Sequence, residues 1–266
     1  MVRQVICQGD NILNMKSMLN EYFDKFLLSV RKVSPSSVKH YGNSLRTISR
    51  YLIKLGKVKE TIFEVDSISE LLSLREFLKT IPEFVALDTK GNRMYTAGLN
   101  RYIEFASADS SFSTPDEIAK LDSPIHFEAK EKIRKSTLAY SRDRIIVHQA
   151  LVSVRFCCEI DKKHKTFIAE ATNENFIEGH HIIPMRLQKN FSYSLDVYAN
   201  ILGVCPNCHR MLHYGRLNDR RSVLSSIFEA RAERLNRSGI NLGRDDFFSL
   251  VESAQQRESL DGMPNE

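Results

Sequence analysis

Cysteine and histidine are concentrated in one short stretch of this 266-residue chain, between Cys157 and His213. Four of the five cysteines and five of the eight histidines lie there. Thiols and imidazoles at such close spacing are typical of metal ligands, whereas a disulfide scaffold needs cysteines spread along the chain. The stretch therefore predicts a domain that a metal ion holds together.

Cys205 and Cys208 are separated by two residues, which is the spacing with which two thiolates bind one zinc ion. A structural zinc has four ligands, and Cys158 and His164 are the upstream pair at a suitable spacing. We therefore expect a structural zinc bound by Cys158, His164, Cys205 and Cys208. Cys157 is an alternative to Cys158, because the sequence does not fix which neighbour faces inward.

Two adjacent histidines, His180 and His181, lie in the segment EGHHIIP, which predicts a strand that ends at Pro184. Adjacent residues of a strand point to opposite faces, so the two imidazoles cannot have the same role. Neutral imidazole binds metals, and histidine also acts as a general base near neutral pH. One histidine facing a metal and the other facing a water is the natural division.

A second histidine pair lies downstream, where Pro206 begins a predicted helix. His209 and His213 are four residues apart and therefore share one helical face. The expected order is strand 176–183, loop 184–199, strand 201–204 and helix 206–214. A divalent metal would lie between the first strand and the helix.

These segments resemble a known motif. EGHHIIP followed by LDVYANILGVCPNCHRMLHYG resembles the HNH, or ββα-metal, nuclease motif, and in particular the zinc-containing form found in bacterial restriction endonucleases. The resemblance runs from Cys158 to Gly215, and the three namesake positions are His181, Asn200 and His209. It departs from the family where Cys158 and His164 stand in place of the usual first CxxC pair.

The resemblance implies a role for each residue of the motif. His181 would be the general base that activates water for in-line attack on phosphorus, and Asn200 would orient it by hydrogen-bonding across the loop. His180 and His209 would bind a catalytic divalent ion, Mg²⁺ or alternatively Mn²⁺ or Ni²⁺. This ion would stabilise charge on the phosphate and on the leaving 3′ oxygen, without a covalent intermediate.

Two further residues have open roles. His213 either completes the metal shell or contacts phosphate. Arg210 either contacts the scissile strand or is an exposed helical residue.

Positive charge is concentrated between Arg31 and Glu60, where eight Lys and Arg accompany one acid, against a net charge of +5 for the whole chain. Ser34-Pro35 predicts the start of a helix there, and Gly56 its end. The segment SPSSVKHYGNSLRTISRYL also resembles the core-binding domain of tyrosine recombinases. We expect a DNA-binding domain with phosphate contacts from Lys39, Arg46, Arg50 and Lys54. A domain for dimerisation or protein contacts is the alternative.

The sequence as a whole predicts an α+β protein. An all-helical domain (1–106) is expected to precede a linker rich in Ser, Asp and Pro (107–127) and a zinc-stapled nuclease domain with flanking helices (128–254, core 155–215). Residues 128–154 are expected to be helical and 255–266 to form a disordered tail. No apolar run reaches 18 residues, so we expect no membrane segment and a cytoplasmic protein.

The predicted function is metal-dependent hydrolysis of double-stranded DNA by a restriction or defence endonuclease. Recognition of modified bases is a variant of the same function. A non-catalytic zinc-containing DNA-binding protein and a homing or recombination-associated nuclease are the alternatives. A homodimer is an open question, because cutting both strands with one active site per chain favours two copies.

Overall fold

The computed structural model describes residues 18–108, 112, 114–126, 131–134, 137–140 and 142–261, and it describes the side chains among them outside 131–140 and 253–261. The chain divides into two compact units, Met1–Asp109 and Ser110–Glu266. No helix among the described residues combines the length and the apolar character that crossing a membrane requires.

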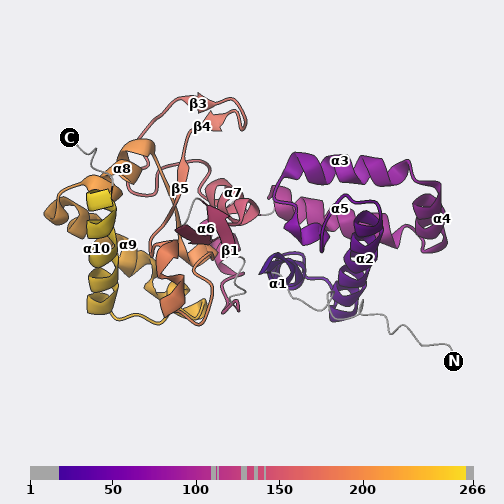
Figure 1. Ribbon diagram of the computed structural model, residues 1–266, viewed down its shortest axis with the longest axis horizontal. Helices are drawn as coiled ribbons and strands as arrows, with labels where there is room; N and C mark the ends of the chain where they lie inside the picture. The colour runs from indigo at the N-terminus through magenta and orange to yellow at the C-terminus, as the bar shows by residue number, and fades with distance from the viewer. Residues whose placement is uncertain are drawn as a thin grey trace. The chain divides into compact units, whose positions relative to one another are not determined.

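The described part of the first unit consists of helices (Figure 1). They are α1 (Met18–Lys25), the π-helix η2 (Phe26–Val30), α2 (Pro35–Lys54), the 3-10 helix η3 (Ile62–Glu64), α3 (Ile68–Lys79), α4 (Pro82–Lys90) and α5 (Met94–Ser107). Helix α2 begins as the sequence predicts, because the Ser34 side chain accepts a hydrogen bond from the backbone N–H of Ser37 and Pro35 occupies the first turn. Gly56 follows the helix with a φ of 66°.

Apolar side chains on one face of α2 form the centre of this unit. Val38, Leu45, Ile48 and Leu52 are buried there. Helix α5 approaches α2 closely at Gly98, where an added Cβ would lie 2.9 Å from the Cβ of Ser44. The polar face of α2 is consequently left to solvent.

The second unit combines helices with small antiparallel sheets. Its helices are α6 (Pro115–Ala119), α7 (Arg144–Ser153), α8 (Pro206–Tyr214), α9 (Leu217–Arg237) and α10 (Arg244–Asp261), with 3-10 turns η4 (Met185–Asn190) and η5 (Tyr198–Asn200). Its described strands pair as β1 (Glu131–Arg134) with β2 (Thr137–Tyr140), β3 (Ile168–Ala169) with β4 (Glu174–Asn175), and β5 (Glu178–His181) with β6 (Ile201–Val204).

The β5–β6 pair carries the histidines and is covered by α7. Gly179 lies opposite Gly203 in the register. A Cβ on Gly179 would meet the Val147 side chain of α7 at 2.6 Å, and one on Gly203 would meet Val154 at 2.9 Å. Both positions therefore require glycine for the helix to pack this closely on the strands. Helix α8 follows β6 directly, which places Cys208 and His209 beside the sheet.

The structure differs from the sequence predictions in three segments. Residues 107–127 were expected to be a linker, but 115–119 form a helix and Phe112, Ile118, Leu121 and Ile125 are buried. The start of this helix is capped, since Thr114 and Glu117 form a capping box and Pro115 occupies the first turn. Residues 128–154 were expected to be helical, but 131–140 contain two paired strands. Helix α10 runs to Asp261, so the expected tail is wrong for 255–261, and 262–266 lie outside the described residues.

Candidate metal centres

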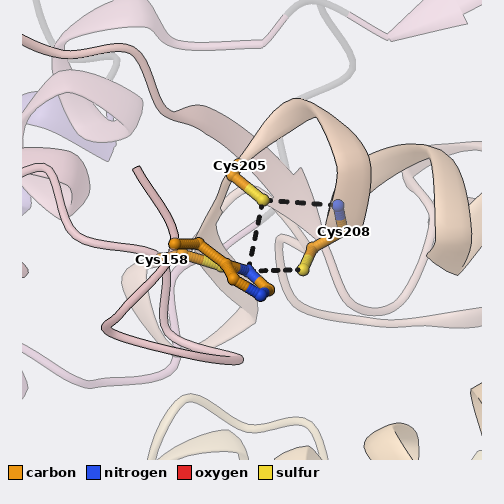
Figure 2. A group of neighbouring side chains, drawn as sticks. Cys158, Cys205 and Cys208 are labelled. Atoms are coloured by element: carbon orange, nitrogen blue, oxygen red, sulfur yellow. Dashed lines mark hydrogen bonds between the residues drawn. The ribbon is translucent and has the colours of Figure 1, made fainter. Parts of the chain in front are cut away.

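The first candidate metal centre consists of Cys158, His164, Cys205 and Cys208, whose ligand atoms all lie within 4.8 Å of one another. The Nδ1 atom of His164 is 3.5 Å from the Cys205 sulfur and 3.3 Å from the Cys208 sulfur. Figure 2 shows the three cysteine sulfurs turned toward one another, with dashed lines from Cys205 and Cys208 meeting at one ring nitrogen. The neighbouring Cys157 is not a member of this group.

Local backbone geometry arranges these ligands. Cys205 precedes the first turn of α8, and its sulfur accepts a hydrogen bond of 3.5 Å from the backbone N–H of Cys208. The Nε2 atom of His164 lies 3.7 Å from a carboxylate oxygen of Asp161, so that Nδ1 is the nitrogen that faces the sulfurs. Two segments more than forty residues apart are thereby brought to one point.

The three cysteines of this centre can all be deprotonated only when a cation lies between their sulfurs. Burial raises the pKa of the Cys158 thiol. Hydrogen bonds from the backbone N–H groups of Asp161 and Cys205 and from the side chain of His164 have the larger, opposite effect, and the net pKa is lowered to about 7. Burial and a hydrogen bond with Cys205 raise the pKa of the Cys208 thiol. Three buried sulfurs at this spacing cannot all be thiolates without a positive charge between them, and a metal supplies that charge.

The distances fit zinc. Around a tetrahedral zinc, with Zn–S of ~2.3 Å and Zn–N of ~2.05 Å, a sulfur and a nitrogen ligand lie ~3.6 Å apart. The observed separations of 3.5 and 3.3 Å are close to this value. Three sulfurs and one imidazole nitrogen are also a donor set that zinc prefers. The cluster can therefore hold a metal ion such as zinc.

The second candidate centre consists of His180, His209 and His213, whose ligand atoms also lie within 4.8 Å of one another. The Nε2 atoms of His209 and His213 are 3.2 Å apart, and the His180 ring centroid is 5.1 Å and 4.9 Å from theirs. Two nitrogens that bind one ion at ~2.1 Å lie ~3.0 Å apart in an octahedral site and ~3.4 Å apart in a tetrahedral one. The spacing suits one divalent ion between strand β5 and helix α8.

Two features prepare these imidazoles for a metal. Burial, followed by the neighbouring His213 and His209, holds the pKa of His180 well below its usual value, so its ring is neutral at neutral pH. The Nδ1–H of His209 donates a 2.7 Å hydrogen bond to the carboxylate of Glu178, which leaves Nε2 toward His213. A carboxylate on the outer nitrogen fixes the tautomer and makes the inner nitrogen a better donor to a metal.

The His181 side chain lies in a different environment from that of His180. Its Nε2–H donates a 2.7 Å hydrogen bond to Oδ1 of Asp196, and both side chains are almost fully buried. The second oxygen of Asp196 accepts from the backbone N–H of Asp143, at the start of α7, at 2.6 Å. The carboxylate is thus fixed from two sides, and it fixes the ring of His181.

Asn200 is completely buried and forms hydrogen bonds across the loop. Its Oδ1 accepts from the N–H of Ile183, and its Nδ2 donates to the carbonyl oxygens of Ile183 and Leu195, all at 2.8 to 2.9 Å. These hydrogen bonds cross the loop between His181 and Asp196, and Asp196 is the direct partner of the His181 ring. Orientation of His181 by Asn200 stays a prediction.

Glu178 and Asp196 were not predicted as site residues. Glu178 opens the EGHHIIP segment, and strand alternation places it on the same face as His180, which was a usable signal. Asp196 lies 15 residues from His181 in the sequence, and no spacing rule connects the two.

The basic residues expected to bind DNA are exposed. Lys39, Arg46, Arg50 and Lys54 lie within one face of α2, opposite its buried residues. Arg46 also donates a 2.7 Å hydrogen bond to Asn43. On α8, Arg210 is exposed, with its guanidinium 5.8 Å from the centre of the Tyr214 ring.

Comparison with known proteins gives one informative similarity. No protein-family model matches the chain. Over 93 residues the chain is 31% identical to the type IV methyl-directed restriction enzyme EcoKMcrA of Escherichia coli (strain K12). The aligned region is 35% of this chain and 29% of that enzyme, so the chain spans less than a third of its relative's length. The similarity supports a restriction-endonuclease-like family.

Proposed function

We propose that this protein is a metal-dependent HNH endonuclease that hydrolyses phosphodiester bonds of double-stranded DNA in a restriction or defence role. The observation that carries the proposal is the second metal centre, in which three imidazoles converge beside the buried pair of His181 and Asp196. A purely structural zinc module has no use for this second group. The partial similarity to a restriction enzyme supports the same class of activity.

The three converging imidazoles are the proposed ligands of the catalytic ion. His180 and His213 contribute with His209, whose basicity is raised by the carboxylate of Glu178. A divalent ion such as Mg²⁺, Mn²⁺ or Ni²⁺, once bound there, would stabilise negative charge on the phosphate and on the leaving 3′ oxygen. His213 is assigned to the metal rather than to phosphate, because its Nε2 faces that of His209.

His181 is the proposed general base. Because Nε2–H donates to Asp196, Nδ1 is the ring atom that can accept a proton from the attacking water. The Asp196 carboxylate then stabilises the imidazolium that forms. Water attacks phosphorus directly, so no residue of the chain becomes covalently attached to the substrate. Asn200 acts indirectly, by holding the loop between His181 and Asp196.

DNA binding is assigned to two regions of the chain. In the first unit, the basic face of α2 from Lys39 to Lys54 is ~22 Å long at 1.5 Å per residue. Such a stripe is long enough to contact phosphates along a groove edge. In the second unit, exposed Arg210 lies one residue from His209 and is the proposed contact for a phosphate next to the scissile one.

The test is cleavage of supercoiled plasmid, prepared with and without base methylation, in the presence of Mg²⁺, Mn²⁺ or Ni²⁺. Wild type is expected to nick or linearise at least one plasmid. His181→Ala is expected to bind DNA but to lose cleavage, and the exposed His126→Ala is the control that should cut like wild type. Equal behaviour of wild type and His181→Ala would support the non-catalytic zinc protein instead. The cut sites on the two plasmids distinguish a restriction enzyme from a homing or recombination nuclease.

A further inference from the structure

The β3–β4 hairpin and its flanking residues, 166–176, form a finger that is drawn away from the rest of the second unit (Figure 1). Its pairing continues beyond the strands, because the backbone N–H of Phe176 donates to the carbonyl of Phe167 at 2.9 Å. The proposed nuclease mechanism gives this finger no role.

The finger exposes two large apolar side chains. Phe167 is 64% exposed and Ile168 is 61% exposed, the two highest values among the exposed large hydrophobic residues described. One face of the Phe167 ring stacks on Phe176, with centroids 4.7 Å apart and an interplanar angle of 18°. The stacking holds the ring in one orientation while most of its surface stays exposed to water. Phe167 and Ile168 are neighbours in an extended segment, so they present apolar surface on opposite faces of the finger.

Charge along the finger is unevenly distributed. Exposed Lys162, Lys163 and Lys165 lie just before Phe167, at the base of the finger. The exposed acids lie at the far end of the finger: Glu170 is in the turn, and Glu174 is the first residue of β4. An extended polyanion that contacts Phe167 would therefore meet lysines on the side of the base, and it would avoid the acids at the tip.

The base of the finger is held by hydrogen bonds and is close in the sequence to residues of both metal centres. Thr166 donates two hydrogen bonds to the Asn175 side chain, which in turn donates to the carbonyl of Phe156. The finger begins two residues after His164 and ends two residues before Glu178, the partner of His209. Two strand residues span ~7 Å, so Phe176 lies about that far along the chain from Glu178.

We infer that this finger contacts the DNA duplex beside the cleaved phosphate, with Phe167 stacked against bases and the lysines on phosphates. The inference rests on the proposed function for its ligand. Proteins deform and hold nucleic acid by inserting apolar side chains such as Phe or Ile between base pairs and by stacking aromatic rings on bases. The lysines favour DNA over a second copy of this chain, whose own finger would present the same positive charge.

The absence of tryptophan from the chain permits a direct test. Phe167→Trp places the single indole of the protein at the proposed contact. The probe is sheared genomic duplex DNA, methylated or unmethylated, added to zinc-loaded full-length protein without a further divalent ion. We expect strong quenching of the Trp fluorescence and protection from acrylamide on DNA binding. The matched control is Leu72→Trp, an exposed position on α3, which should keep its emission and its acrylamide accessibility.

A second measurement gives the contribution to affinity. Loss of one stacked aromatic weakens binding by ~5-fold to ~150-fold, so Phe167→Ala should bind the same DNA within that range below wild type. Phe167→Tyr should restore affinity to within about twofold, since its ring also stacks. The zinc content of both variants should equal that of wild type, which excludes unfolding as the cause.

Each outcome decides between explanations. If the protein binds DNA while Phe167→Trp is neither quenched nor protected, the inference is wrong. If Phe167→Ala changes the sedimentation of the protein alone and not its DNA affinity, the finger binds a second copy of the chain and the inference is again wrong. If DNA quenches the fluorescence of Phe167→Trp but the wild-type protein cuts no plasmid, the proposed DNA contact of the finger stands and the proposed nuclease activity is wrong. If the protein cuts plasmid but substitutions at Phe167 change neither fluorescence nor DNA affinity, the nuclease activity stands and the finger contact is wrong.

Discussion

The carboxylate of Glu178 offers the sharpest test of the second metal centre. We expect Glu178→Gln to weaken binding of Mn²⁺ or Ni²⁺ at His180, His209 and His213 while leaving zinc at the other centre. The 2.7 Å hydrogen bond from His209 is replaced by a bond to a neutral amide, so the inner nitrogen loses basicity and the ring loses its fixed tautomer.

The magnitude follows from the contact. A hydrogen bond to a charged group contributes ~1.5–3 kcal/mol, and more when buried. The side chains of His209 and Glu178 are 26% and 35% exposed, which places this bond at the lower end, because water screens the charge. A loss of ~1.5–2 kcal/mol corresponds to ~10-fold to ~30-fold weaker binding. This agrees with the ~10–100-fold effect of losing such a partner in other metal sites.

The assay is calorimetric titration of Mn²⁺ and Ni²⁺ into zinc-loaded protein. The matched control is Glu174→Gln, which removes the same charge from an exposed position four residues away. We expect the control to bind within twofold of wild type. Equal affinities for Glu178→Gln and Glu174→Gln would refute the assignment of Glu178, and a loss of zinc in Glu178→Gln would show that the change acts on the fold instead.

Three further changes address other parts of the site. Asn200→Ala should lower the free energy of unfolding by ~3–5 kcal/mol, measured by urea denaturation, because three buried backbone groups lose their partner; a change below 1 kcal/mol would contradict this role. Asp196→Asn should slow plasmid cleavage by ~10²–10⁴-fold, and unchanged cleavage rates would remove His181 from the role of base. Cys208→Ser should release zinc, measured by atomic emission, and the second unit should lose its cooperative thermal unfolding transition. Binding of a structural zinc contributes ~10–16 kcal/mol, which is comparable to the total free energy of unfolding of a domain. Retention of one zinc per chain in that variant would show that the cysteine is not a ligand.

Local signals in the sequence were enough to predict where two functional helices begin. The cap at Ser34 and the proline at position 206 each fix a helix start through neighbouring atoms, and the structure places α2 and α8 at those positions. The segments 107–127 and 131–140 were misread for other reasons. Their polar composition suggests an open chain or a helix. Burial of Phe112 depends on packing against other parts of the fold, whereas β1 and β2 form a local hairpin that the helical interpretation of this basic segment missed.

The sequence by itself determined which residue types could bind metal and how they are spaced: Cys205 with Cys208, and His209 with His213, because a turn of helix or a zinc knuckle relates residues three or four apart. The tertiary structure alone decided that Cys158 rather than Cys157 joins the sulfurs, that Asp196 holds His181, and that Asn200 braces the loop. These pairings join residues distant in the chain or choose between neighbours, and only the packing of α7, β5 and β6 brings their atoms within hydrogen-bonding or ligand distance.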